Sequence, residues 1–194
     1  MEHISSCIAD RLVLNQIIDE SDRIYYSYSI QLILERIVGI SLICIASLFV
    51  HAFFQIAVFL MIFAVVRMSC DGYHCKTSIG CFIVSVLVSL STVPVSYVYL
   101  LCPEIYQVEM ILSVIFIFCV GTIRDPNLGL TEREWCHLKK RSRITIVMVG
   151  IPIIVLMILV PRSLFVSYMA LGVIYNAISL MIVKITGEEV PDNE

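Results

Sequence analysis

Long apolar stretches separated by short charged clusters are the feature that most constrains how this chain can fold. Hydrophobic residues occupy 59% of the 194 positions, whereas an ordinary soluble domain is about half apolar, and the mean hydropathy is +0.95. The charged residues gather in the first 36 positions, at 67–76, at 124–143 and at the C-terminal tail. This distribution indicates a protein that crosses a membrane several times.

The uncharged stretches have the length of membrane-spanning helices. A helix needs about 20 mostly apolar residues to cross the hydrocarbon layer. Six segments meet this requirement: 28–50, 52–68, 78–101, 105–123, 144–160 and 164–185. Only the first holds an adjacent charged pair, Glu35 and Arg36, which we expect near the headgroups or facing other helices. The sequence therefore predicts an all-α membrane protein with six transmembrane helices.

The basic residues predict the orientation of these spans. Six Lys or Arg residues lie in the loop 124–143, and Arg67 and Lys76 lie in the loop that follows the second span. The loops on the opposite side contribute only Arg162. Because cytoplasmic loops carry the excess of Lys and Arg, we expect both termini in the cytoplasm.

The N-terminal segment 1–24 differs from the membrane domain, which we place at 25–194. It contains five acidic residues and no continuous apolar core, so we expect no cleavable signal peptide. One side of a helix would carry its apolar residues Ile4, Cys7, Ile8, Leu12, Leu14 and Ile18. A short amphipathic helix on the cytoplasmic surface of the bilayer fits this moderate periodicity.

The large basic loop contains local signals for a turn and a helix. Asp125-Pro126-Asn127 indicates a turn, and Thr131 with Glu134 forms a capping box. The helix that begins there would run through Lys139–Arg143 into the fifth span. Its basic run can set the topology and contact lipid headgroups, or it can bind an acidic peptide.

The segment 67–81 concentrates side chains suited to thiol chemistry. Cys81 would lie in the first turn of the third span, where free backbone amides lower the pKa of a thiol, as would a nearby imidazolium. His74 could serve as the base and then as the acid that protonates a leaving amine. We therefore predict that His74 and Cys81 form a catalytic pair at the cytoplasmic end of the bundle.

This pair requires a bend in the chain. Seven residues of continuous helix rise about 10.5 Å, whereas a hydrogen bond needs a separation of about 3 Å. Gly72 and Gly80 bracket the segment and permit a turn. We expect a re-entrant or folded-back loop that brings His74 over the start of the third span.

The other cysteines allow two alternatives. Of the eight cysteines, only Cys102 would face outward, so we expect reduced thiols and no disulfide framework. Cys75 is a second candidate nucleophile beside His74. Cys70, His74, Cys75 and Cys81 could supply four metal ligands, but their spacing lacks the Cys-x-x-Cys pair of most structural zinc sites. We expect neither a metal nor another cofactor.

These motifs together resemble the accessory gene regulator protein B (AgrB) family, the membrane-embedded cysteine peptidases of bacterial quorum sensing. The similarity rests on Arg67, Gly72-Tyr73-His74, Lys76-Thr77, Cys81 and Ser85, and on Asp125-Pro126-Asn127, Leu130-Thr131 and Glu134 before the basic run. With the six-span pattern, it covers most of the chain.

The resemblance implies a substrate and an activity. The substrate would be a precursor peptide like the family's AgrD, with an amphipathic leader, a core with a cysteine or serine, and an acidic tail. Cys81 would cleave off the tail through a thioester, and cyclisation would give a thiolactone or lactone. Arg67, Gly72 and Ser85 would support or position the substrate. The acidic tail would contact Lys139, Lys140, Arg141 and Arg143.

The family resemblance also implies a homodimer in the bacterial cell membrane, and we expect no nucleic-acid partner. The competing class is a non-enzymatic small transporter or peptide-binding scaffold in which His74 and Cys81 are incidental. Such a protein would use polar groups deep in its spans, for which Gln55, Glu109 and Asn176 are the candidates.

Overall fold

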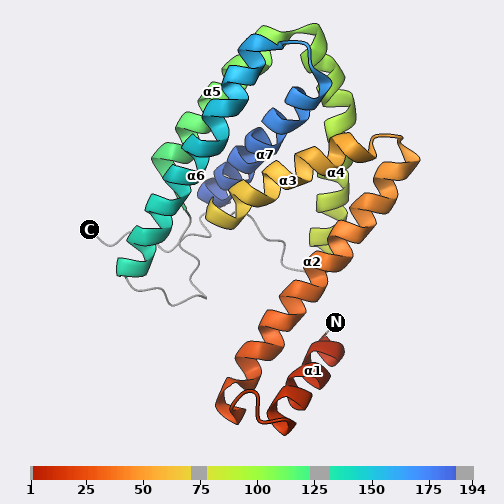
Figure 1. Cartoon of the computed structure of the whole chain (residues 1–194), viewed down its shortest axis with the longest axis vertical. Coiled ribbons are helices and arrows are strands. Elements are labelled where there is room, and N and C mark those ends of the chain that lie inside the picture. The colour runs from red at the N-terminus through yellow and green to blue at the C-terminus, as the bar shows by residue number, and fades with distance from the viewer. Residues whose placement is uncertain (1, 71–77, 123–131, 187–194) are drawn as a thin grey trace.

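The computed structural model describes residues 2–70, 78–122 and 132–186. Within these ranges all regular structure is helical, as predicted (Figure 1). The elements are α1 (Glu2–Leu14), the 3-10 turn η1 (Glu20–Asp22), α2 (Arg23–Phe49), α3 (Phe53–Cys70), α4 (Ser78–Leu101), α5 (Pro103–Val120), α6 (Glu132–Leu159) and α7 (Leu164–Thr186). Helices α2 to α7 are long and apolar enough to cross a membrane, which confirms the six predicted spans. The chain is therefore a multi-pass membrane protein.

Two helix ends differ from the predicted spans by three residues or more. Helix α2 begins at Arg23, five residues before the predicted start, because polar residues at a span end can continue the helix beyond the hydrocarbon layer. Helix α5 ends at Val120, three residues early, because Gly121 has a φ of +77° that a right-handed helix cannot contain. Helix α6 is continuous from Glu132 to Leu159, so the basic segment and the fifth span form one helix, as expected.

The N-terminal segment forms a helical hairpin with α2. Helix α1 ends at Leu14, and Gln16 has a φ of +57° in the turn that follows. Helix α1 thus occupies the first part of the segment 1–24, and α2 begins within the same segment, at Arg23. Ser5 and Ala9 are buried where α1 packs on α2. The predicted position of α1 on the bilayer surface stays a prediction.

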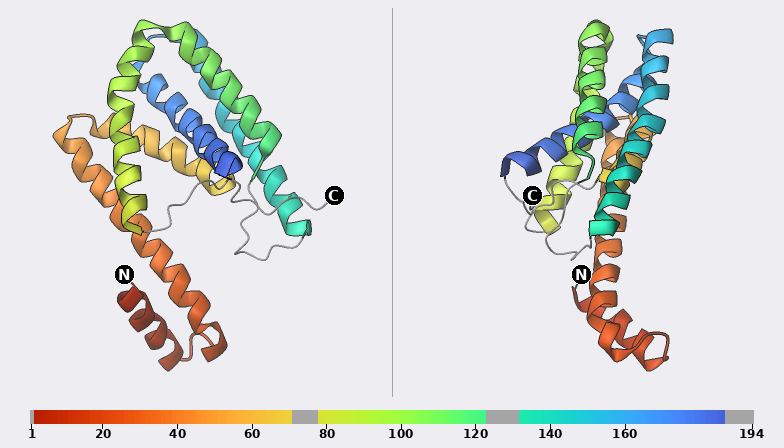
Figure 2. Two further views of the ribbon diagram at one scale, coloured as in Figure 1. Left: turned by 180° about the vertical axis from the view of Figure 1, so that it is seen from behind. Right: turned by 90° about the vertical axis from the view of Figure 1, so that its left-hand side faces the viewer.

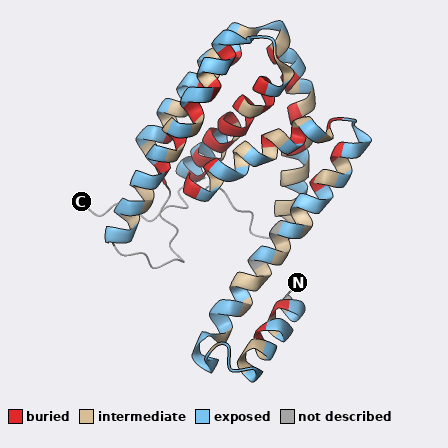
Figure 3. Ribbon diagram, viewed as in Figure 1, coloured by how far each residue is buried: buried red, intermediate tan, exposed pale blue. Residues whose placement is uncertain are grey.

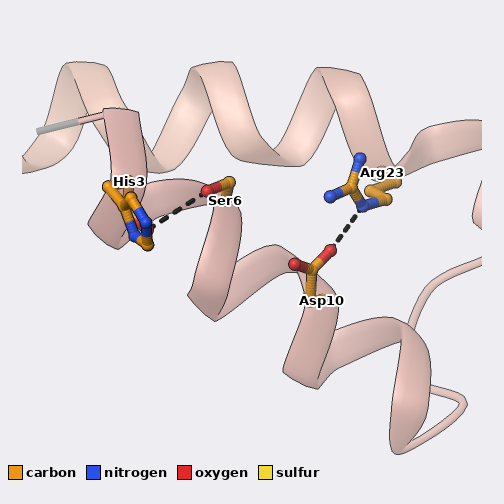
Figure 4. A network of polar contacts seen from close by, with 4 residues as sticks. All are labelled: His3, Ser6, Asp10 and Arg23. Atoms are coloured by element: carbon orange, nitrogen blue, oxygen red, sulfur yellow. Dashed lines mark hydrogen bonds and ion pairs between the residues drawn. The ribbon is translucent and has the colours of Figure 1, made fainter.

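One ion pair closes this hairpin. The Nε of Arg23 donates to Oδ1 of Asp10 at 2.5 Å, and the hydroxyl of Ser6 donates to the carbonyl of His3 within α1 at 3.1 Å (Figure 4). The hydrogen bond from Arg23 lowers the pKa of the Asp10 carboxyl, because it favours the ionised form. Both side chains are partly exposed, so the pair joins α1 to α2 at the surface.

Helix α7 is the centre of the bundle. In its most apolar stretch 67% of the residues are buried, compared with 28% or less in every other span (Figure 3). It packs most extensively on α3, and the two helices approach closely at Gly172. A methyl group at Gly172 would lie 3.0 Å from Cβ of Ile62 and 3.1 Å from the backbone nitrogen of Phe63. Only glycine leaves room for this approach of the two backbones.

Contacts between helices give their relative directions. Along α3 and α7, Asn176 contacts Phe63 and Ser179 contacts Arg67, so the two helices run parallel. Helix α6 runs antiparallel to α3, since Thr145 contacts Ser69 and Ser142 contacts Cys70. Both directions agree with six successive crossings of a membrane. The ends of α3, α5 and α7 and the start of α6 therefore meet at one end of the bundle, near which α4 begins (Figure 2).

Candidate functional site

Cys81 lies at this end of the bundle, in the first turn of α4. Its thiol is free and its side chain is half-buried. The first four backbone N–H groups of a helix have no partner within the helix, so they favour a negative charge near them. Ser85 follows one turn later on the same face and is also half-buried. The structure thus places a half-buried thiol and a half-buried hydroxyl one helical turn apart at the start of α4.

The beginning of α4 is supported by α2. At Gly39 a methyl group would lie 3.5 Å from the ring of Phe82, the residue after Cys81, which is ordinary van der Waals contact. Helix α4 has more extensive contacts with α2 than with α3. The first turn of α4 is therefore positioned by the first span as well as by its own chain neighbours.

The partners predicted for Cys81 lie in the segment 71–77. Gly72, His74 and Cys75 all fall outside the described residues, and so does the predicted folded-back loop. The His74–Cys81 pair and the rival role of Cys75 thus stay predictions. Of the four cysteines and histidines weighed as metal ligands, Cys70 and Cys81 are described, and the described residues contain no group of three potential ligands.

Arg67 is held in the last turn of α3 by a residue from the end of the chain. Its Nη1 donates to the Oγ of Ser179 on α7 at 2.6 Å. The arginine side chain is half-buried. A hydrogen bond from a charged donor is stronger than one between neutral groups, so this contact joins α3 to α7 where both helices end.

Two further contacts join the last turn of α3 to α6. The hydroxyls of Ser69 and Thr145 are 3.0 Å apart, and Sγ of Cys70 lies 2.9 Å from Oγ of Ser142. Ser142 also donates to the carbonyl of Gly121, at 3.1 Å, just beyond the end of α5. Of these residues, only Cys70 was considered from the sequence, as a possible metal ligand. The only sequence signal for them was the spacing of Ser142 and Thr145, which places two hydroxyls on one face of a helix.

The four basic residues predicted to bind a peptide tail divide into two pairs. The ammonium group of Lys139 lies 4.4 Å from the centre of the Trp135 ring. Arg143 donates from Nε to the carbonyl of Phe118 at 3.1 Å and lies over the ring of the same residue. These two cations contact their own chain. Lys140 and Arg141 are exposed.

The polar residues deep in the spans contact other groups of the chain. Asn176 is fully buried, and its amide donates to the carbonyls of Phe63 and Gly172 at 3.1 and 2.7 Å. The carboxylate of Glu109 accepts a hydrogen bond from the hydroxyl of Tyr99. Asn176 therefore bridges α3 and α7, and Glu109 joins α4 to α5.

A comparison with protein-family models gives one match to this chain. The family described as Accessory gene regulator B matches residues 5–182, which is nearly the whole chain. Comparisons with curated proteins and with solved structures give no match. The matched range includes five spans in full, most of the sixth, and each of the candidate site residues.

Proposed function

The chain belongs to the accessory gene regulator B family, and from this membership we propose that it is a membrane-embedded cysteine endopeptidase. Membership links the chain to accessory gene regulation and to the processing of an autoinducing peptide. The proposed substrate is an AgrD-like precursor peptide, from which the enzyme removes the C-terminal tail. The observation that carries the proposal is the half-buried free thiol of Cys81 in the first turn of α4, at the end of the bundle where Arg67 also lies.

The proposed reaction begins with the thiolate of Cys81. Its Sγ attacks the carbonyl carbon at the end of the peptide core, and the bond from that carbon to the tail nitrogen breaks. His74 gives the leaving amine its proton. The core then remains attached to Cys81 as a thioester, whose bond is preserved if water is excluded.

Cyclisation requires no further energy source. A thiol of the precursor core attacks the thioester carbon, a thiolactone ring forms, and the thiolate of Cys81 is released. One thioester replaces another, so the free-energy change is small. A serine in the core would give a lactone by the same route.

Gly72 and Ser85 have supporting roles in the proposed site. Gly72 would permit the chain reversal that brings His74 to Cys81, and Ser85 would line the approach to the thiol.

The acidic tail would be held by cations at the same end of the bundle. Lys139 contacts the Trp135 ring and Arg143 contacts Phe118, so the exposed Lys140 and Arg141 are the first candidates among the four basic residues. The positive-inside rule places this end, the active site and both termini on the cytoplasmic side of a bacterial cell membrane. We infer a homodimer only from similarity to the family.

The alternative is a non-enzymatic transporter or peptide-binding scaffold. The burial of Asn176 and the pairing of Glu109 with Tyr99 weigh against it, because these contacts already join helices to one another. Gln55 is half-buried near the start of α3. A path for a solute would need polar groups turned to a cavity, whereas the side-chain amide of Asn176 donates to two backbone carbonyls and Glu109 accepts from Tyr99.

Cleavage of the precursor by the purified protein tests the proposal. The full chain in lipid vesicles is mixed with the precursor peptide, and the products are followed by mass spectrometry. We expect Cys81→Ala to lower the cleavage rate more than about a hundredfold, whereas Cys119→Ala, which removes an exposed thiol from α5, should leave it unchanged. An acid-quenched sample should show the peptide core attached to Cys81.

Two outcomes would change the assignment. Cleavage that survives in Cys81→Ala but not in Cys75→Ala would make Cys75 the nucleophile. Cleavage that survives both substitutions, or a wild-type protein that only binds the intact precursor, would favour the scaffold.

A further inference from the structure

Ser142 lies between the ends of two helices, of which one precedes the segment with His74 and the other precedes the Asp125-Pro126-Asn127 motif. Its Oγ is 2.9 Å from Sγ of Cys70, the last residue of α3, and 3.1 Å from the carbonyl oxygen of Gly121, directly after α5. Cys70 and Ser142 are both fully buried. In the sequence His74 follows Cys70 by four residues, and the Asp125-Pro126-Asn127 motif follows Gly121 by four residues.

The chemistry of the three groups fixes the direction of their hydrogen bonds. A carbonyl oxygen can only accept, so the single hydrogen of the Ser142 hydroxyl is donated to Gly121. The Oγ of Ser142 then accepts the hydrogen of the Cys70 thiol. The hydrogen bonds then run from Cys70 through Ser142 to Gly121.

The neighbouring contacts restrict Gly121 further. A methyl group at this residue would lie 2.7 Å from Cγ of Lys139, so the lysine stem occupies the space beside it. The φ of +77° is one that residues with a side chain rarely adopt. Gly121 is thus held by its carbonyl on Ser142 and by the stem of Lys139, both from α6.

Arg67 and the end of α3 are restricted in the same way. Ser179 on α7 holds the guanidinium group, and Thr145 on α6 contacts Ser69. The hydroxyl of Ser142 contacts both the last residue of α3 and the residue after α5. Buried hydroxyl groups in proteins are normally hydrogen-bonded. The buried hydroxyl of Ser142 meets this requirement through its two hydrogen bonds.

We propose that Ser142 is a positioning residue for peptide cleavage, which acts by joining the end of α3 through Cys70 to the end of α5 through Gly121. This inference rests on the proposed function. Ser142 need not touch the peptide; it sets the separation of the helix ends from which the His74 segment and the proline-asparagine segment continue. Its loss should therefore reduce turnover more than substrate binding.

Cleavage kinetics of matched variants test the role in the reaction. Ser142→Ala should lower kcat at least tenfold, change KM less than twofold, and leave the unfolding temperature close to that of Ser91→Ala. Ser91 is the control because its hydroxyl joins α4 to α7 by a similar contact, 2.8 Å from the hydroxyl of Tyr175. Cys70→Ala should reproduce the loss and Cys70→Ser should restore it, since serine can donate the same hydrogen bond. A loss in Ser142→Ala no larger than in Ser91→Ala would overturn the inference.

A distance measurement separates this inference from the proposed function. Spin labels at Met68→Cys and at Cys119, both exposed positions near the two helix ends, are introduced into full-length protein whose other cysteines except Cys70 are serine. Pulsed electron paramagnetic resonance should give a narrow distance distribution that broadens in Ser142→Ala but not in Ser91→Ala. An unchanged distribution would overturn the inference whatever the activity. A wild type that does not cleave the precursor would instead contradict the proposed function, while the distances would still decide whether Ser142 joins the helix ends.

Discussion

Arg67 near the end of α3 donates a hydrogen bond of 2.6 Å to Ser179 near the end of α7, a residue 112 positions later in the chain. The contact joins the second and sixth spans at the end of the bundle that carries Cys81. It also bears on the predicted role of Arg67, which is to support the site or to position the substrate. A hydrogen bond from a charged donor is stronger than one between neutral groups, so the contact with Ser179 restricts where the guanidinium group can lie.

Removing the hydroxyl of Ser179 should release Arg67. We expect Ser179→Ala to lower cleavage about tenfold, because a hydrogen bond to a charged group contributes about 1.5–3 kcal/mol. Initial rates in lipid vesicles would measure this effect. Ser41→Ala is the control, since that exposed hydroxyl donates to the carbonyl of Ile37 in its own helix. Equal rates in the two variants would show that Arg67 does not depend on Ser179.

The close approach of α3 and α7 should make Gly172 intolerant of larger residues. A methyl group there would press on Ile62 and on the backbone of Phe63, and overpacking of this kind costs about 1–3 kcal/mol. We expect Gly172→Ala to lower the unfolding temperature in detergent, and Gly172→Leu to prevent recovery of folded protein. Gly39→Ala is the matched control, because its methyl group would meet the ring of Phe82 at an ordinary distance of 3.5 Å. Equal stability of Gly172→Ala and Gly39→Ala would contradict the predicted clash.

Charge reversal should separate the two pairs of basic residues on α6. Lys140→Glu combined with Arg141→Glu should raise KM for a precursor with an acidic tail by about tenfold or more, and salt should weaken wild-type binding in the same direction. Lys139→Gln combined with Arg143→Gln should instead lower the unfolding temperature, because Lys139 contacts Trp135 and Arg143 contacts Phe118. Binding measured with a tail peptide, beside thermal unfolding, checks both effects. If KM is unchanged in the double variant of Lys140 and Arg141, these exposed cations contact lipid headgroups and not the peptide tail.

The ion pair between Asp10 and Arg23 should hold α1 against α2 in a pH-dependent way. The pKa of Asp10 is lowered in the folded hairpin, so its stabilising effect is present above the carboxyl's usual pKa of about 4 and is lost as the pH falls below it. At neutral pH, Asp10→Asn should speed hydrogen exchange of residues 2–14 without changing the unfolding of the six spans. Exchange that is equally slow in Asp10→Asn at pH 7 would show that burial of Ser5 and Ala9 alone holds the helix.

The number of spans and the all-helical class could be predicted from the sequence because a bilayer imposes simple physical limits. The hydrocarbon layer requires about 20 apolar residues per crossing, and a helix satisfies every backbone polar group within its own segment. The same local reasoning correctly made the basic segment and the fifth span one helix. It was less accurate at ends such as those of α1 and α5, because the backbone conformations of Gln16 and Gly121 are not visible in a pattern of apolar residues.

Part of the candidate site could also be predicted from the sequence. Local spacing was enough to place Cys81 in the first turn of a helix and Arg67 on the same side of the membrane. The approach of His74 to Cys81 depends on residues outside the described ranges, so it stays a prediction. The roles of Ser142 and Ser179 could not be predicted, because a serine in a helix gives no local sign of the carbonyl, thiol or guanidinium that it will meet across the bundle.

The sequence by itself determined the membrane class, the six spans and the reactive residues at the ends of the helices, since all of these depend on neighbours along the chain. Only the tertiary structure decided that α7 is the central helix, that Gly172 lets α3 approach it, and that Lys139 and Arg143 contact their own chain. The spans are all apolar, so hydrophobicity cannot select their neighbours in a lipid environment. Close packing at small residues and hydrogen bonds between helices make that selection.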